Sequence, residues 1–228
     1  MPFGSTIVEV QARQIHSDRG HPGVEATVFT EGGAKGTAVV TAGISVGEHE
    51  VQFAYDGGEK WRGGGVMKAV RHVEEIIGPA ILGMDATQQL AVDDVIIQLD
   101  GTPNKTKLGG NATGSVSAAV LQAGAASLEI PLYQHIGGVH ACTLPVPGVL
   151  TVIGSGRYGS GKRSGGKPSY SMMCYGFDTY SDASYAGWVV NREFCSLLKS
   201  RFNQDTNKGW GLVQPGVVQH DRELWDLM

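Results

Sequence analysis

A glycine-rich stretch at residues 154–167, GSGRYGSGKRSGGK, has residue types that bind phosphate groups. Its glycines at 154, 156 and 159 match the G-x-G-x-x-G pattern of dinucleotide sites, and residues 156–162 match the G-x-x-x-x-G-K pattern of phosphate loops. Both sites need a helix directly after the glycines, because the helix N-terminus binds the phosphate. The residues that follow, RSGGKPSY, contain two glycines and a proline instead. We therefore predict a flexible or anion-contacting loop at the mouth of a barrel, and no nucleotide site.

The cysteine and histidine side chains show no metal-ligating pattern. The three cysteines form no C-x-x-C pair, and the seven histidines are scattered along the chain. We therefore expect buried, reduced thiols and no zinc site.

The charge balance argues against a nucleic-acid partner. The chain has 18 basic and 22 acidic residues, a formal net charge of −4, so no general basic surface is expected. The first residues show no basic segment followed by an apolar core, and no apolar run approaches the ~20 residues of a membrane span. We expect a soluble, cytoplasmic protein that binds no nucleic acid and has no membrane span.

The first half of the sequence predicts a small sheet followed by helices. Apolar and polar residues alternate over 6–15, 23–30 and 36–41, with a Glu-Gly-Gly turn at 31–33, which indicates an antiparallel three-stranded meander. A helical period then begins at Gly65 and should end at Pro79. A second helix, capped by Asp85 or Thr87, has the apolar residues Leu90, Val92, Val95, Ile96 and Leu99. Further helices are expected at 111–128 and 131–136.

The second half predicts alternating strands and helices. The prolines at 144–147 indicate a linker, which separates a first domain, 1–142, from a second, 143–228. Beyond the linker, strands are expected at 149–153, 169–175 and 210–214. Helices are expected at 179–202, with apolar Tyr185, Val189, Phe194, Leu197 and Leu198, and at 219–228. This order is the start of an α/β barrel with too few units to close.

Several motifs in the first half resemble the enolase family. The resemblance is dense over residues 6–147 and thin afterwards, and its most specific motifs are GMDAT at 83–87, LDGT at 99–102 and NKTKLGGNA at 104–112. The resemblance implies an α+β N-terminal domain, with a three-stranded antiparallel meander plus helices. It also implies that this domain is followed by the start of an enolase-type α/β barrel, incomplete in this chain.

The resemblance implies a lyase chemistry, the dehydration of 2-phosphoglycerate to phosphoenolpyruvate in glycolysis. A lysine base removes a proton next to a carboxylate, Mg²⁺ ions hold the resulting charge, and a glutamate protonates the leaving hydroxyl. Gly43 and Ser45 fall on the loop that closes over the substrate, and Ser45 falls on a serine that ligates Mg²⁺. Lys162 falls on a substrate-binding lysine of the glycine loop.

The second half departs from the family at the catalytic positions. Tyr158 replaces an active-site histidine, and residues 166–169 lack the glutamate that should follow the glycine loop. The segment Gly209–Pro215, which matches the region of the general acid, has no carboxylate. The family's metal carboxylates, base lysine and phosphate-binding residues lie beyond the matched half. We therefore expect no catalytic residue in this chain and no turnover by the chain alone.

The resemblance also bears on partners. Arg19 and Glu25 fall on positions used for subunit contact in the enolase dimer, so a homodimer or a complementing barrel chain is expected. Because an incomplete barrel leaves a strand edge unpaired, the strands at 149–153 and 169–175 should form that edge. Three hypotheses remain: part of an enolase-type lyase, a catalytically inactive enolase-like binding or scaffold protein, and a binder of small anions through Ser45, Lys162 and Arg163.

Overall fold

The computed structural model describes residues 4–43, 47, 49–153, 169–203, 206–207, 210–212 and 226. The chain forms two compact units. The first is built from Met1–Ile44 and His49–Cys142, and the second contains Thr143–Met228. The helix predicted at 219–228 lies outside the described residues, except for Asp226.

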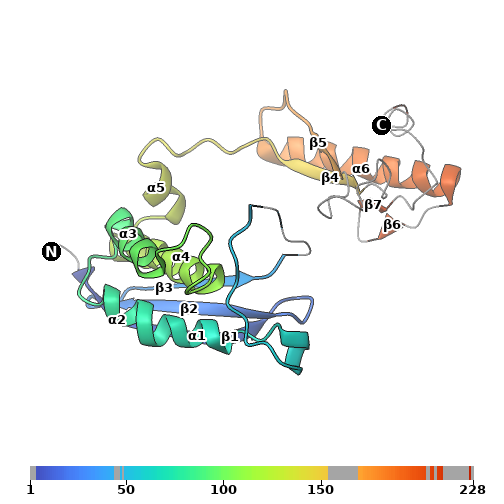
Figure 1. Ribbon diagram of the computed structural model, residues 1–228. Coiled ribbons are helices and arrows are strands. Elements are labelled where there is room, and N and C mark those ends of the chain that lie inside the picture. The colour runs from blue at the N-terminus through green and yellow to red at the C-terminus, as the bar shows by residue number, and fades with distance from the viewer. Residues whose placement is uncertain are drawn as a thin grey trace. The chain divides into compact units, whose positions relative to one another are not determined.

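The first unit is built on a three-stranded antiparallel sheet in the order β1-β2-β3, shown in blue in Figure 1. Its strands are β1 (Ile7–His16), β2 (Pro22–Thr30) and β3 (Lys35–Thr41). Ala26 lies opposite Ala12 of β1 and Ala38 of β3, so small residues meet at the centre of the sheet. The predicted meander is confirmed, because strict alternation puts one face of each strand into the core.

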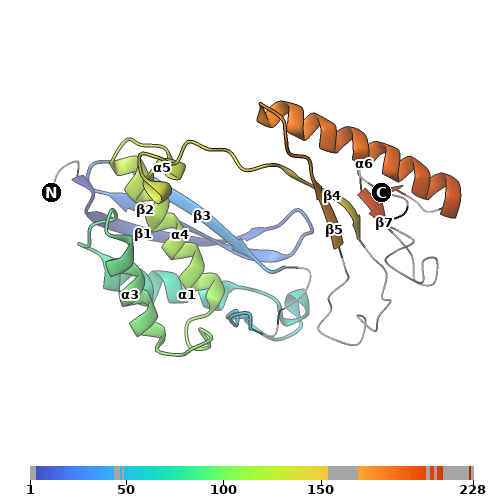
Figure 2. The same ribbon diagram turned by 90° about the horizontal axis from the view of Figure 1, so that it is seen from above.

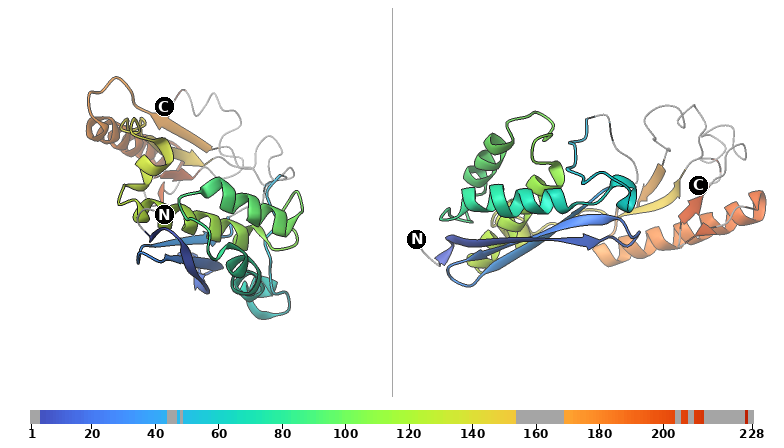
Figure 3. Two further views of the ribbon diagram at one scale, coloured as in Figure 1. Left: turned by 90° about the vertical axis from the view of Figure 1, so that its left-hand side faces the viewer. Right: turned by 60° about the horizontal axis from the view of Figure 1, so that its bottom comes forward.

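Helices cover one face of this sheet (Figure 3). The regular and distorted helical segments are η2 (Lys60–Gly63), α1 (Met67–His72), η3 (Val73–Ile77), α2 (Gly78–Ile81), α3 (Gln89–Asp100), α4 (Gly110–Ser127) and α5 (Leu132–Gly137). The long helix α4 packs directly on β2 and β3, and α3 packs on α4. The small side chains of α4 allow this close approach.

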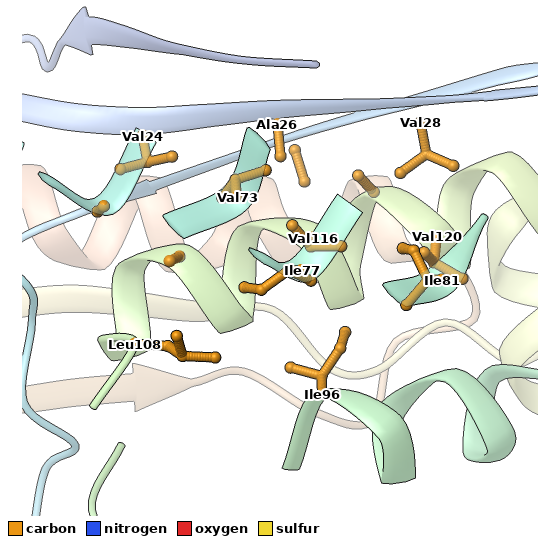
Figure 4. Packing of buried hydrophobic residues seen from close by; sticks show 14 of the residues in the cluster. Val24, Ala26, Val28, Val73, Ile77, Ile81, Ile96, Leu108, Val116 and Val120 are labelled. Carbon is orange, nitrogen blue, oxygen red and sulfur yellow. The ribbon is translucent and has the colours of Figure 1, made fainter. Parts of the chain in front are cut away.

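The core lies between the sheet and these helices (Figure 4). Val24, Ala26 and Val28 of β2 point toward Val116 and Val120 of α4, and all five are fully buried. The four apolar residues predicted for the first helix also lie in this core: Val66, Val70, Val73 and Ile77. Burial of these side chains is the main stabilising term of the unit.

Helical structure continues beyond Pro79, where the sequence predicted an end. The five residues of η3 form a π-helical turn, and α2 then begins at Gly78 and runs to Ile81. Pro79 therefore lies in the first turn of α2, where a missing N–H removes no helical hydrogen bond. The prediction was wrong because a change of helix type resets the positions at which proline is tolerated.

The apolar set predicted for the second helix is only partly buried. Val92 and Ile96 are buried in the core, whereas Leu90 is 83% exposed. Asp85 does not cap this helix, since α3 begins at Gln89; its carboxylate instead accepts hydrogen bonds from the N–H and hydroxyl of Thr87. The start of the helix was placed too early, and Leu90 is exposed because it lies about 200° around the helix from buried Val92.

The second unit contains a mixed four-stranded sheet and one long helix. Its sheet has the order β5-β4-β7-β6, and its elements are β4 (Gly148–Ile153), β5 (Ser169–Met173), α6 (Tyr180–Phe202), β6 (Thr206–Asn207) and β7 (Trp210–Leu212). β4 and β5 are antiparallel, and β4 and β7 are parallel. The helix α6, drawn in orange in Figure 2, packs on β4. The short strand β6 was not predicted.

Helix α6 has an N-cap that its sequence explains. Thr179 accepts a hydrogen bond from the N–H of Asp182 and donates its hydroxyl proton to the Asp182 carboxylate, which satisfies an otherwise free helical donor. Phe194 and Leu198 are buried as predicted. Tyr185 is not, because it lies on the opposite side of the helix and is 68% exposed.

The prediction that the strands at 149–153 and 169–175 both form the open edge of the sheet was wrong for the first of them. β4 is an inner strand, paired with β5 on one side and with β7 on the other. Among the described strands the sheet ends at β5 on one side and at β6 on the other, so of the two predicted edge strands only β5 lies at an edge. The parallel return of β7 to β4 is the feature that sequence order did not reveal.

Candidate functional site

The loop that follows β3 carries two of the predicted site residues. Gly43 is exposed and lies two residues beyond the end of β3. Ser45, predicted to bind substrate and Mg²⁺, lies outside the described residues, as does Lys162. Of the three substrate-binding predictions, Gly43 alone therefore has a described position.

The beginning of this loop is held by Arg19. Its Nη2 donates a hydrogen bond of 2.8 Å to the carbonyl oxygen of Ala42. The turn that contains Arg19 is itself closed, because the N–H of Ser17 donates to the carbonyl of His21 at 2.8 Å. Arg19, predicted from the resemblance as a subunit contact, has a hydrogen-bond partner within its own chain.

The end of the loop is held by the segment that precedes α4. The N–H of Gln52 donates to the carbonyl of Asn104 at 2.8 Å, and the carbonyl of Gln52 accepts from the N–H of Gly110 at 2.7 Å. Both bonds join main-chain groups, so they place the loop end with little dependence on side-chain identity.

A buried asparagine, Asn111, binds the same segment two residues after Gln52, at Ala54. The Oδ1 atom of Asn111 accepts from the N–H of Ala54 at 2.9 Å, and its Nδ2 donates to the carbonyl of Ala54 at 3.0 Å. Asn111 is fully buried and Ala54 is 8% exposed. The side chain therefore satisfies both main-chain groups of Ala54, as a neighbouring strand would.

The segment between α3 and α4 is organised around Asp100, which is buried. One carboxylate oxygen accepts from the N–H and the hydroxyl of Thr102, and the other accepts from the N–H of Leu108 at 2.7 Å. Burial by itself raises the pKa of Asp100, but the hydrogen bonds from Thr102 and Leu108, with Lys105 nearby, hold the net pKa below its ordinary value. The ionised form is therefore the one that the fold favours.

We expect Asp100→Asn to destabilise the first unit by about 2 kcal/mol at neutral pH, because an amide N–H would face a main-chain donor. Since the folded pKa is depressed, the contribution of Asp100 is complete above the unfolded pKa of about 3.9 and is lost as the pH falls through the folded value. The difference in unfolding free energy between wild type and variant should thus shrink below about pH 4. Urea denaturation at several pH values measures it. Asp94→Asn, an exposed change on the same helix, is the control, and an equal loss there contradicts the prediction.

Glu25, the second predicted subunit contact, lies beside Arg13 on the neighbouring strand. Arg13 Nε and Glu25 Oε1 are 2.5 Å apart, and this hydrogen bond raises the pKa of the Arg13 guanidinium. The pair lines an open pocket of about 480 Å³, together with Gln11, Ala12, Thr27 and Glu74. Sequence reasoning missed Arg13, although the antiparallel register opposite Glu25 could have revealed it.

The described residues do not supply a magnesium site. Within the part of the chain that is described, no three Asp, Glu, His or Cys side chains gather closely enough to hold a metal ion. Mg²⁺ requires several oxygen ligands in octahedral geometry. The described residues therefore do not fit this ion.

Three residues of the segment that matches the general-acid region, Trp210–Leu212, are described and form β7 of the second sheet. Val152 and Ile153 of β4 pair with Gly211 and Leu212 of β7 in parallel, so this segment continues the sheet as a barrel strand would. The carboxylates of Asp178, before α6, and of Asp182 and Glu193, on α6, are exposed. None of the described helices is long and apolar enough to cross a membrane.

Comparison with known proteins identifies the family. Residues 7–136 match the family model described as the enolase N-terminal domain. The chain is 43% identical over 208 residues to the enolase of Bifidobacterium longum subsp. infantis, a match that covers 91% of this chain and 47% of the relative. It is 40% identical over 223 residues to the enolase of Methanothrix thermoacetophila, covering 97% of this chain and 52% of the relative. The chain thus spans about half the length of the curated relatives it matches, and it belongs to the enolase family.

Proposed function

We propose that this chain supplies the N-terminal domain of an enolase-type lyase, which converts 2-phosphoglycerate to phosphoenolpyruvate. The observation that carries the proposal is the loop after β3, which is fastened at Ala42 and at Gln52 on a domain that matches the family over residues 7–136. Such a domain can present Ser45 to a substrate held elsewhere. Sites on helices and strands are more precise than sites on loops, so a loop whose ends are bound to such elements is positioned more accurately than a free loop.

The proposal includes the absence of turnover by the isolated chain. The sequence Gly209–Pro215 has no carboxylate where the family places its general acid, and loss of a general acid costs roughly 10²–10⁴-fold in rate. The base and the metal carboxylates would come from the rest of an enolase-type barrel, in a cytoplasmic assembly. In that assembly Ser45 would add one oxygen ligand to Mg²⁺, and Arg19 and Glu25 would contact a partner or a second copy.

A chimera tests the proposal directly. Residues 1–142 of this chain replace the corresponding domain of the Bifidobacterium longum enolase, and phosphoenolpyruvate formation is followed by its ultraviolet absorbance. We expect the chimera to be active and the full chain alone to be inactive. Ser45→Ala should lower the activity of the chimera by at least about 10-fold, as loss of a metal-site contact does. Val46→Ala, a change at the next residue, is the matched control.

A folded chimera without activity would favour the second candidate, a catalytically inactive enolase-like binding protein. One observation supports this candidate: Tyr185 and Trp188 of α6 stack at 6.2 Å, with the guanidinium of Arg192 5.3 Å from the Trp188 ring. Both aromatic residues are more than half exposed, and exposed aromatic side chains are enriched where proteins bind one another. Native mass spectrometry of the chain purified from its source distinguishes a bound partner from a chain that comes alone.

A further inference from the structure

We propose that two copies of this chain pair along the free edge of β1, in an antiparallel arrangement centred on Ala12 that joins their two sheets into one. The inference concerns the first unit alone and does not depend on any lyase activity. It also differs from the subunit contact expected at Arg19 and Glu25, because the pairing groups belong to the main chain at one edge of the sheet.

The edge of β1 is open over most of its length. β1 is an outer strand of the first sheet, drawn in dark blue in Figure 3. Its first residue is covered, because Ile7 donates its N–H to the carbonyl of Met84 at 2.8 Å and accepts from the N–H of Gly83 at 2.9 Å. Over Val8–His16 the main chain makes no further bond on that side within the residues that the structure describes. Two open pockets, of about 480 and 160 Å³, border the strand over Val8–Arg13. An unpaired edge of this kind is a template for another strand.

The neighbouring hairpin determines which main-chain groups of β1 point outward. The N–H of Thr30 donates to the carbonyl of Ala34 at 2.9 Å, so the main-chain groups of Thr30 point toward β3. Because this direction alternates along a strand, Thr27 points toward β1, where it faces Gln11. The outward groups of β1 therefore belong to the alternate residues: Val10, Ala12 and Gln14.

The length of the open edge sets the register of the pair. Two copies of an edge that runs from residue 8 to residue 16 overlap completely when they are centred on residue 12. A centre at residue 11 would bring Ile15 of the second copy beside Ile7, where Gly83 and Met84 already lie. The side chain at the centre is that of Ala12, which is small enough for two copies to meet at the symmetry axis. Each outward pair would then exchange two main-chain hydrogen bonds.

The charges of β1 complement each other in this register. Val10 and Ala12 pack against the core, so Glu9, Gln11 and Arg13 lie on the opposite face of the sheet. There Gln11 would lie opposite Arg13 of the second copy, with Glu9 diagonal to it and within reach of a long side chain. The Arg13 side chain is available for this contact, since it is 72% exposed although it binds Glu25. A two-fold symmetric interface requires such a self-complementary surface.

Substitutions of Gln11, whose side chain is exposed, test both the pairing and its register. Sedimentation equilibrium of the full chain measures the dissociation constant of the dimer. We expect Gln11→Glu to lower this constant by about 10-fold, because a new ion pair with Arg13 forms on each side of the axis, and Gln11→Lys to raise it by about 10-fold. Lys35→Glu, which reverses an exposed charge on β3 at the other edge of the sheet, should leave it unchanged.

The outward direction of Ala12 has its own test. Ala12→Pro removes the N–H at the axis without removing a bond to β2, and proline is tolerated at such edge positions. This variant should be monomeric, with the far-ultraviolet circular dichroism spectrum of wild type. In wild type, amide exchange followed by NMR should be slow at Ala12 in the dimer and fast in the monomer obtained by dilution, whereas Arg13 should exchange slowly in both.

The inference is wrong if the chain sediments as a monomer, or if a dimer keeps its dissociation constant in both Gln11 variants. Weaker dimers in both of them would also contradict it, because Gln11 would then face itself and not Arg13. If Ala12→Pro does not fold, the opposite shifts expected for the two Gln11 variants still decide the question. None of these measurements uses enolase activity, so an inactive chimera would leave the pairing of β1 unaffected.

Discussion

Gly36→Ala is expected to lower the melting temperature of the first unit by about 10 °C or more. Gly36 lies in β3 where the sheet meets α4. A Cβ atom at this position would lie 2.1 Å from the carbonyl oxygen of Ala119 and 2.3 Å from the N–H nitrogen of Ala123. Both are main-chain atoms of the helix, so no side-chain rotation relieves the clash, and α4 must move away from the sheet.

The expected cost is more than about 3 kcal/mol, at the upper end of what overpacking a core produces. This is a large part of the 5–15 kcal/mol that holds a typical domain together. Gly114→Ala is the matched control, because its Cβ would lie 3.7 Å from a methyl group of Val40, an ordinary contact. That variant should gain up to about 1 kcal/mol from helix propensity. Thermal and urea denaturation compare the two, and equal stabilities would contradict the packing argument.

The first unit was largely predictable because its strands and helices bury regularly spaced side chains in one core. Alternation of apolar residues in β1 to β3, and the 3.6-residue period of Val66, Val70, Val73 and Ile77, both follow from a single core lying on one side of the sheet. The small residues of α4 also indicated close packing. These are local patterns, and each agrees with the fold that the enolase resemblance implied.

The errors arose where a distant contact or a change of geometry decides the outcome. The π-helical turn before Pro79 has no signal in hydrophobic period, and Leu90 is exposed because it lies on the side of α3 opposite buried Val92. Tyr185 was counted among the apolar residues of α6, but its side chain lies opposite the buried face of the helix. In the second unit, the return of β7 to pair with β4 depends on topology, which strand order alone does not specify.

The candidate site was predictable only in its position along the chain. Gly43 and Ser45 came from the resemblance, and so did Arg19, but as a subunit contact and not as a residue that binds the start of the loop. Arg19 reaches Ala42 across 23 residues, and Asn111 reaches Ala54 across 57. Contacts over such separations leave no periodic pattern in one sequence, so they could be found only in the folded chain.

The second large loss of stability is expected on substitution of Asn111, where hydrogen bonds are lost, whereas at Gly36 atoms clash. Asn111→Ala removes no large volume, but it leaves the N–H and the carbonyl of Ala54 without their partners in a buried position. Each unpaired main-chain group costs about 1–3 kcal/mol, so a loss of about 3 kcal/mol is expected.

Asn104→Ala provides the control for the change at Asn111, because the Asn104 side chain is exposed and only its carbonyl binds Gln52. This variant should lie within about 0.5 kcal/mol of wild type, as surface changes usually do. Hydrogen exchange followed by mass spectrometry locates the effect: in Asn111→Ala the amide of Ala54 should exchange faster than in Asn104→Ala. Equal exchange at Ala54 in both variants would mean that the main chain, and not Asn111, holds this end of the loop.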